Sequence, residues 1–336
     1  MQYRIRHVTE YIYNAPVSHC YNLAHIIPRT SHRQKCISCD IEIDPNATSK
    51  SIRDDYFGNR AYHFEIQRSH KKLTLISTSK VETSEQSYDK KLEAGTTCGN
   101  AWQALKYSNE AEVLFAREFI LDSPMVKAQP ALLDYASSLF TADKPLLIAV
   151  MELTQKIHSE FTYSPQSTTI ATPLEEVLVT KKGVCQDFAH LQIGCLRALG
   201  FPAKYVSGYL ETLPAPGQEK LVGSDATHAW ISVFCPGQGW VEFDPTNNCI
   251  AAEQHIITAW ARDYYDVTPL KGVIFGGGDN PILSVSVDVS RIEAPATKTR
   301  SQAQMQFQAQ SQNQAQLQGQ AQSQTQYPLP QQTPNS

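Results

Sequence analysis

Alternation between apolar and polar side chains dominates the first hundred residues and restricts what they can form. Tyrosine or isoleucine stands at positions 3, 5, 11 and 13, with charged residues among them, and Ile37, Cys39, Ile41 and Ile43 share one expected face of a later segment. A repeat of two places such residues on one side of a β-strand. We therefore predict an antiparallel β domain of the sandwich type, with a turn at residues 55–59.

Longer spacings between apolar residues follow and predict helices. Residues 131–140 and 146–161 show this spacing, with prolines as punctuation. The clearest helix opens within residues 183–191 and ends at Gly200, since glycine commonly follows the last turn of a helix.

Strands are expected again after this helix, at residues 203–211, 228–234 and 240–244. Strands and helices that occur in blocks indicate an α+β protein. The predicted divisions are a β domain at 1–100, a helical connector at 101–145, a second domain at 146–290 and a tail at 291–336.

Charge argues against several classes of partner. The chain has 29 Lys and Arg against 33 Asp and Glu, a formal net charge of −4, and it lacks basic blocks. Nucleic acid and anionic membrane surfaces are therefore not expected as partners. The longest apolar run, residues 146–151, is too short to span a bilayer. The first residues read as a strand and not as a secretion signal, so a cytoplasmic location is predicted.

The C-terminal tail has a composition of its own. Residues 301–336 contain no charged side chain, and every even position from 302 to 326 is Gln. Such a tract cannot bury a core and is expected to be disordered, either inert or self-associating. A role as an acyl-donor substrate in the same molecule is the less favoured reading.

Three residues have the types and positions that a thiol nucleophile needs. Cys185 falls in the first turn of the expected helix, His228 heads one strand and Asp244 ends the next. A helix N-terminus and a nearby imidazolium favour a thiolate, and a carboxylate on the second imidazole nitrogen fixes the tautomer. A hairpin centred on Pro236 would place His228 directly opposite Asp244, although a centre nearer Gln238 stays open.

These segments, together with their neighbours, resemble the bacterial transglutaminase-like proteins. Residues 183–190 read Gly-Val-Cys-Gln-Asp-Phe-Ala-His, residues 228–230 read His-Ala-Trp, and residues 239–247 read Gly-Trp-Val-Glu-Phe-Asp-Pro-Thr-Asn. Residues 262–267 match a later block of that family, although Ala261 stands where glycine is common. The Asp-Tyr-Phe-Gly-Asn turn at residues 55–59 is similar to the accompanying β domain.

The resemblance implies a papain-like α+β core, in which the second domain is catalytic. It makes Cys185 the nucleophile, His228 the base and Asp244 the orienting acid. Proteins of this fold include crosslinking acyltransferases, proteases and amide hydrolases, so the shared chemistry is an acyl-thioester on the cysteine. We expect a cysteine enzyme that acts on amide or peptide bonds of a peptide or protein, with hydrolysis slightly favoured. Protein-glutamine γ-glutamyltransfer and a non-catalytic binding or assembly module stay open. Neither a metal nor another cofactor is expected.

Further residues are predicted around this centre. The Cys185 N–H is expected to stabilise an oxyanion, together with Gln186 or Tyr163. Asp187 serves the helix dipole or positions its neighbours. Trp230 and Tyr209 are the residues suggested for a substrate pocket.

The remaining cysteines and two histidines are expected to have structural roles. The seven cysteines other than Cys185 are interpreted as packing residues, and Cys36 and Cys39 should face opposite sides of their strand. His190 and His255 are interpreted as buried structural histidines with satisfied hydrogen bonds.

Overall fold

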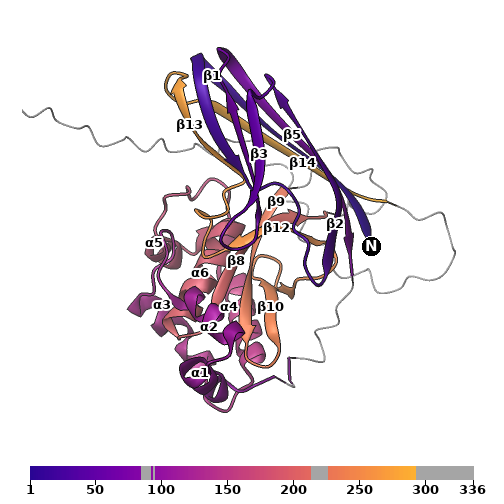
Figure 1. Ribbon diagram of the computed structural model, residues 1–336. Coiled ribbons are helices and arrows are strands. Elements are labelled where there is room, and N and C mark those ends of the chain that lie inside the picture. The colour runs from indigo at the N-terminus through magenta and orange to yellow at the C-terminus, as the bar shows by residue number, and fades with distance from the viewer. Residues whose placement is uncertain (85–91, 94, 213–225, 293–336) are drawn as a thin grey trace, which may run out of the picture.

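The computed structural model describes residues 1–84, 92–93, 95–212 and 226–292 (Figure 1). The Gln-rich tract predicted to be disordered therefore lies outside the described residues. The described part forms an antiparallel sheet of long strands that adjoins a mixed body of helices and a smaller sheet, which confirms the α+β class. Among its helices, none combines the length and the apolar character needed to span a membrane.

The elements are as follows in chain order: β1 (Gln2–Ala24), β2 (Gln34–Asp44), β3 (Ser49–Asp54), β4 (Arg60–Ile66), β5 (His70–Thr83), α1 (Cys98–Tyr107), α2 (Ala111–Arg117), the 3-10 helix η1 (Glu118–Ile120), α3 (Pro130–Ala136), the 3-10 helix η2 (Ser137–Leu139), α4 (Leu146–Glu160), β6 (Thr162–Tyr163), α5 (Leu174–Thr180), β7 (Lys182–Gly183), α6 (Cys185–Ala198), β8 (Ala203–Leu210), β9 (Ala226–Cys235), β10 (Gly239–Asp244), β11 (Cys249–Ile250), β12 (His255–Ala261), β13 (Leu270–Gly276) and β14 (Ile282–Arg291).

The long strand β1 organises the first of these bodies. Its first half lies between β5 and β14, and its second half pairs with β4 and β13. Tyr3, Ile5, Tyr11 and Tyr13 are all buried, as the alternation predicts. We call the unit of β1–β5, β13 and β14 the β body.

The β body takes two strands from the C-terminal side of the described chain. Both β13 and β14 pair with β1 across sequence separations that run from 246 residues, for Ala24 and Leu270, to 288, for Tyr3 and Arg291. The second domain predicted at residues 146–290 therefore includes β13 and most of β14, which pair within the sheet of the first. The alternation of apolar and polar residues within a strand does not indicate which distant strand it pairs with, so this pairing could not be predicted from local patterns.

The prediction that Ile37 shares the inner face of β2 is wrong. A β-bulge between Cys36 and Ser38 inserts one residue, so Ile37 is 44% exposed instead of sharing the inner face with Ile41. The same shift turns Cys36 and Cys39 to one side of the strand, where both are half-buried, and not to opposite sides.

The second body, which we call the α/β body, is built on a five-stranded sheet in the order β11-β10-β9-β8-β12. Helix α6 packs on one face of this sheet with α3, α4 and α5 around it (Figure 1). Its core includes Leu153, Leu191, Leu196, Ile231 and Phe243, all fully buried. The expected helix and strands of this region are therefore present.

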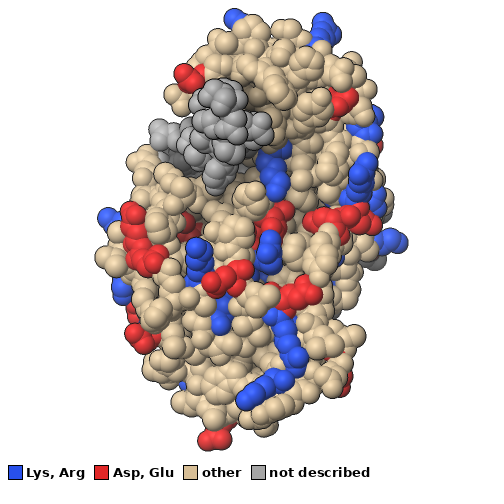
Figure 2. All heavy atoms as spheres, turned by 60° about the vertical axis from the view of Figure 1, so that its left-hand side comes forward, with Lys and Arg blue, Asp and Glu red and all other residues tan. Residues whose placement is uncertain are grey.

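The surface carries charges of both signs. Figure 2 shows Lys and Arg side chains beside Asp and Glu side chains across the middle of one face, with no broad area of a single sign. This agrees with the nearly balanced charge of the sequence.

Candidate active site

The candidate nucleophile is the first residue of α6. The helix runs Cys185–Ala198, and Gly200, which follows its C-cap residue Leu199, has a φ of +83°, which glycine adopts readily. Cys185 is half-buried, whereas nearly all the helix residues after it are buried. The first N–H groups of a helix have no partner within the helix, so the sulfur lies beside amide donors at the positive end of the helix dipole.

Asp187 holds the backbone that leads into Cys185. Its carboxylate accepts hydrogen bonds from the Val184 N–H at 2.8 Å and from the Thr168 hydroxyl at 2.6 Å. A Cβ atom on Gly183 would lie 2.8 Å from the Asp187 side chain, so glycine is needed for this close approach. Burial raises the pKa of Asp187 against the effect of these hydrogen bonds. These contacts agree with one of the two roles considered for Asp187, that of positioning neighbouring groups.

Gln186 and Tyr163 both lie near the start of α6. Gln186 follows Cys185 in the first turn and is 9% exposed. Tyr163 lies in β6, which pairs in parallel with β7, so Tyr163 is opposite Gly183. Its ring lies edge-on to Phe188, with 6.4 Å between centroids. A role for either residue as an oxyanion donor stays a prediction.

His228 and Asp244 are in direct contact. The distance from His228 Nε2 to Asp244 Oδ2 is 2.7 Å, and both side chains are buried. The strands pair with Phe243 opposite Ile231, so the hairpin is centred on Gly237 and not on Pro236. The predicted directly opposed register is therefore wrong. In the observed register, the position opposite His228 lies two residues from Asp244. A shift of two residues keeps the His228 and Asp244 side chains on the same face of the sheet.

Asp244 is saturated with hydrogen bonds. Its Oδ1 accepts from the N–H groups of Thr246 and Asn247, and its Oδ2 accepts from the Asn247 side chain at 2.7 Å as well as from His228. Burial alone would raise the pKa of Asp244, but the histidine beside it and the hydrogen bonds hold that pKa far below its usual range. Asp244 is therefore an anion at neutral pH.

The surroundings of His228 favour its charged form. Burial lowers its pKa, but the Asp244 carboxylate and a hydrogen bond with Cys185 outweigh that effect and raise the pKa to about 10. Since Nε2 is bound to Asp244, Nδ1 is the nitrogen left for Cys185. The structure thus brings Cys185, His228 and Asp244 together around one imidazole.

His255 is a neighbour whose contact with Asp244 sequence reasoning missed. The Ala252 N–H donates to His255 Nδ1 at 3.1 Å, so the proton of the neutral ring lies on Nε2, which donates to Asp244 Oδ2 at 3.0 Å. Burial lowers the pKa of His255, which keeps the ring neutral. Asn247 was also missed as a contact, although it belongs to the quoted Asp-Pro-Thr-Asn segment.

Within the described residues, one cluster has the composition of a metal site. The ligand atoms of His228, Asp244 and His255 all lie within 4.8 Å of one another. However, both imidazole Nε2 atoms donate to the same carboxylate oxygen, so a metal there would displace the protons of these two hydrogen bonds. The donor set is better explained as a hydrogen-bond network.

The structure does not support the pocket roles predicted for Trp230 and Tyr209. Trp230 is 0% exposed and stacks on His228, with 5.9 Å between ring centroids. Tyr209 is 2% exposed, and its hydroxyl is 2.8 Å from His7 Nδ1 in the β body. The Tyr209 ring is enclosed where the two bodies meet, a contact that the sequence pattern did not reveal, whereas Trp230 packs among Val206, Ala251 and Ile257. Neither therefore offers a surface to a substrate.

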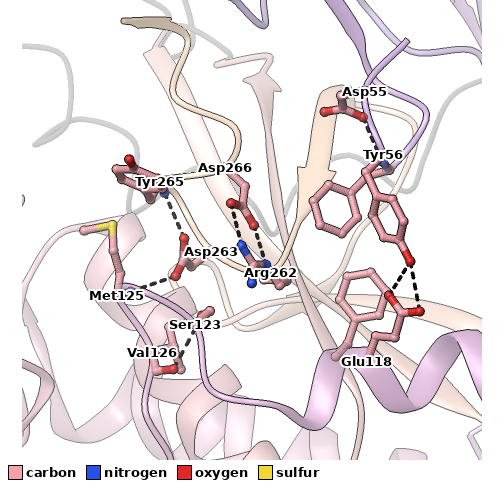
Figure 3. A network of polar contacts seen from close by, with 12 residues as sticks. Asp55, Tyr56, Glu118, Ser123, Met125, Val126, Arg262, Asp263, Tyr265 and Asp266 are labelled. Carbon is pink, nitrogen blue, oxygen red and sulfur yellow. Dashed lines mark hydrogen bonds and ion pairs between the residues drawn. The ribbon is translucent and has the colours of Figure 1, made fainter.

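Residues 262–267 link the connector, residues 101–145, to the α/β body through hydrogen bonds (Figure 3). The Asp263 carboxylate accepts from the Met125 N–H at 2.7 Å and the Tyr265 N–H at 3.0 Å, and Arg262 forms a paired contact with Asp266. The next residue, Tyr264, donates its N–H to His190 Nε2 on α6 at 3.2 Å. His190 is thus structural, and the block supports the helix that carries Cys185.

The β body also reaches the connector in this region. Figure 3 shows the Tyr56 hydroxyl directed at the Glu118 carboxylate, with oxygen–oxygen distances of 2.8 and 2.9 Å. The Asp55 carboxylate accepts from the N–H groups of Phe57 and Asn59, which forms the turn expected at residues 55–59.

Comparison with known proteins identifies the family. Residues 3–82 match the bacterial transglutaminase-like N-terminal region, and residues 134–245 match the transglutaminase-like superfamily. An uncharacterized protein of Mycobacterium tuberculosis is 39% identical over 296 residues, which cover 87% of this chain and 93% of that relative. A protein-glutamine γ-glutamyltransferase of Pseudomonas aeruginosa is 35% identical over 102 residues, which cover 29% of this chain and 15% of that protein.

A solved structure shows the same fold. It is a protein of Cytophaga hutchinsonii, provisionally named a cysteine protease, with a TM-score of 0.69 and 20% identity over 90% of this chain and 94% of its own. The sequence matches and this fold agree with the resemblance found in the motifs. The chain is therefore a member of the transglutaminase-like superfamily that carries the bacterial N-terminal region of that family.

Proposed function

We propose that this protein is a thiol enzyme that cleaves amide or peptide bonds through an acyl intermediate on Cys185, with water as the main acceptor. The single observation that carries the proposal is the placement of the His228 imidazole between Cys185 and Asp244. This arrangement supplies a nucleophile, a proton carrier and a group that orients the carrier. Membership of the superfamily supports a cysteine enzyme but leaves the acceptor open.

The first half of the reaction forms the acyl-enzyme. The Cys185 thiolate attacks the carbonyl carbon, the new S–C bond forms, and the carbonyl electron pair moves onto oxygen. That oxygen would lie near the N–H groups at the start of α6. The intermediate collapses as the C–N bond breaks, and the leaving amine takes the proton of the His228 imidazolium.

The second half releases the acyl group. Neutral His228 removes a proton from water, the oxygen bonds to the thioester carbon, and the S–C bond breaks to return the thiolate and a carboxylic acid. Throughout the cycle, Asp244 stays ionised and holds the Nε2 proton of His228. A primary amine in place of water gives a new amide by the same steps.

Transfer to an amine is the second candidate function. It is favoured by the local similarity to the Pseudomonas aeruginosa protein, whose name specifies γ-glutamyl transfer. We extend the proposal to a peptide or protein substrate in the cytoplasm. The nearly balanced charge, without basic blocks, disfavours nucleic-acid and membrane partners.

One experiment tests the reaction and its acceptor together. Glutamine-containing peptides are incubated with the enzyme and a biotin-labelled primary amine, and mass spectrometry follows three products: cleaved or deamidated peptide, amine adduct, and the acyl-Cys185 peptide. We expect hydrolysis and acyl-Cys185. A predominance of adduct would instead establish transfer.

The controls use matched thiols. Cys185→Ser should abolish all three products, whereas Cys39→Ser, which changes another half-buried cysteine, should leave them unchanged. Intact peptides and unmodified Cys185 across a diverse peptide library would contradict the proposal and support a binding module.

A further inference from the structure

A buried ion pair joins the β body to the strand that carries Asp244. Arg33, in the turn before β2, donates from Nε to Glu242 Oε1 at 3.1 Å and from Nη2 to Glu242 Oε2 at 2.6 Å. Its Nη1 donates to the Ala252 carbonyl at 3.1 Å. Arg33 is 3% exposed and Glu242 is 8% exposed, so water competes little for these contacts.

Glu242 in turn anchors the ring beside the catalytic histidine. The Trp230 indole N–H donates to Glu242 Oε2 at 2.6 Å. Trp230 stacks on His228 with 26° between the ring planes, and it meets the His255 ring edge-on at a centroid distance of 5.2 Å. One indole thus touches both imidazoles that bind Asp244, and its orientation is set by a carboxylate that Arg33 holds.

The β body also completes the edge of the catalytic sheet. Strand β12 is an edge strand and begins at His255. The Gln34 amide donates to the Ile257 carbonyl at 2.8 Å and accepts from the Ile257 N–H at 2.7 Å. The Asn59 amide makes the same pair of contacts with Trp260, at 2.9 Å each. Side-chain amides from the β body therefore stand in for a neighbouring strand.

We propose that Arg33, Glu242 and Trp230 are positioning residues that hold His228 and His255 against Asp244. The β body is then part of the catalytic apparatus and not a separate recognition module. This inference rests on the proposed function, because it assigns the network to the same His228 that serves Cys185. The groups that face His228 are Asp244, His255, Cys185, the Trp230 ring and the Asn247 amide, which lies 3.3 Å from Nε2.

Two conservative variants separate positioning from folding. Arg33→Lys keeps the positive charge but loses the paired geometry with Glu242. Trp230→Phe keeps an aromatic face on His228 but loses the N–H that Glu242 orients. The matched control is Arg291→Lys, since Arg291 makes an equally paired contact with Glu211, at 2.8 Å for each nitrogen, where β14 meets the end of β8.

Two readouts are measured on the full chain, with thermal unfolding to confirm folding. The first is the pKa of His228 from NMR titration of carbon-labelled histidine, assigned with His228→Gln. The second is the rate of Cys185 alkylation by iodoacetamide as a function of pH. Arg33→Lys and Trp230→Phe should lower the His228 pKa by about one unit. They should also slow alkylation by about tenfold, because a displaced imidazolium stabilises the Cys185 thiolate less. Arg291→Lys should do neither.

The outcomes distinguish this inference from the proposed function. Wild-type values of the His228 pKa in both variants would overturn the inference, and so would an equal drop in Arg291→Lys. A lowered pKa in both variants with an unreactive Cys185 in the wild type would support positioning while refuting the thiol enzyme. A folded Trp230→Phe protein keeps the test valid even if Arg33→Lys unfolds.

Discussion

His255 donates a hydrogen bond to the same Asp244 oxygen that binds His228, with nitrogen–oxygen distances of 3.0 and 2.7 Å. The Ala252 N–H occupies the other nitrogen of His255, so this ring can only donate to Asp244. The carboxylate is thus oriented by one histidine while it orients another.

Replacing His255 should weaken catalysis without abolishing it. His255→Phe fills a similar volume but removes a donor from Asp244 Oδ2, so the carboxylate becomes easier to protonate and less firmly placed. We expect kcat to fall about tenfold, with KM nearly unchanged and the acid limb of the pH profile moved to higher pH. His255→Gln, which can still donate, should recover part of the rate. An unchanged profile in His255→Phe would show that the contact is structural only.

Iodoacetamide should modify Cys185 before the other cysteines at neutral pH. Burial raises the pKa of six of the remaining seven thiols, namely those of Cys20, Cys36, Cys98, Cys195, Cys235 and Cys249. His228→Ala should slow the Cys185 reaction at least about tenfold by removing its proton partner. Peptide mass spectrometry after timed labelling measures each site, and faster labelling of Cys39 than of Cys185 would contradict this prediction.

The stability contributed by His228 should decline at alkaline pH. The pKa of His228 is about 10 in the folded state, against about 6.5 for a free imidazole, so the folded state binds more protons between these values. Its contribution is complete below about pH 6.5 and is lost as pH rises towards 10. Urea unfolding across this range should show a smaller decline for His228→Gln than for the wild type.

Titration of Lys204 should offset part of the loss of stability that His228 causes at alkaline pH. Its ammonium lies 3.6 Å from the centre of the Trp240 ring, and burial, reinforced by Arg29, lowers its pKa to about 7. The unfolded chain then binds more protons above about pH 7, so this group makes stability rise with pH. In Lys204→Met, the free energy of unfolding should therefore fall more steeply between about pH 7 and 10 than in the wild type. Parallel curves for the two proteins would refute this assignment.

Gly183→Ala should impair the site through the turn before α6. The new Cβ would lie 2.8 Å from the Asp187 carboxylate oxygen, so the contact that orients Val184 must shift. We expect a loss of about 1–3 kcal/mol in stability and slower Cys185 alkylation. Gly194→Ala is the control, because it crowds Leu132 at 2.7 Å further along the same helix. Equal alkylation rates in the two variants would contradict the role of the turn.

Local patterns were sufficient to predict the α+β class, the helix that begins at Cys185 and the strands of His228 and Asp244. Each of these depends on periodicity and on a stop such as Gly200, which act within a few residues. The hairpin centre was misplaced by one residue because Pro236 and Gly237 both suit a turn. The prediction that His228 and Asp244 share one face of the sheet is unaffected, because the residue opposite each of them changes by two positions and side chains alternate with a period of two.

Features set by distant contacts could not be predicted in this way. The bulge at Cys36 turns Ile37 outward, and no alternation rule anticipates an inserted residue. The burial of Tyr209 depends on His7, some 200 residues earlier, and the contact of His255 depends on how β12 is placed. Tyr209 was assigned to a pocket and His255 to the core because the sequence pattern did not reveal which residues lie beside them.

The pairing of β14 with the first half of β1 has a consequence for synthesis of the chain. Residues 3–12 are synthesised well before residues 282–291, so one edge of that strand has no partner until the later segment has followed. The interval between them contains Cys185, His228 and Asp244. A nascent chain that already contains Cys185 and His228 would therefore still lack the finished β body, and full reactivity of the thiol should appear only after translation has passed β14.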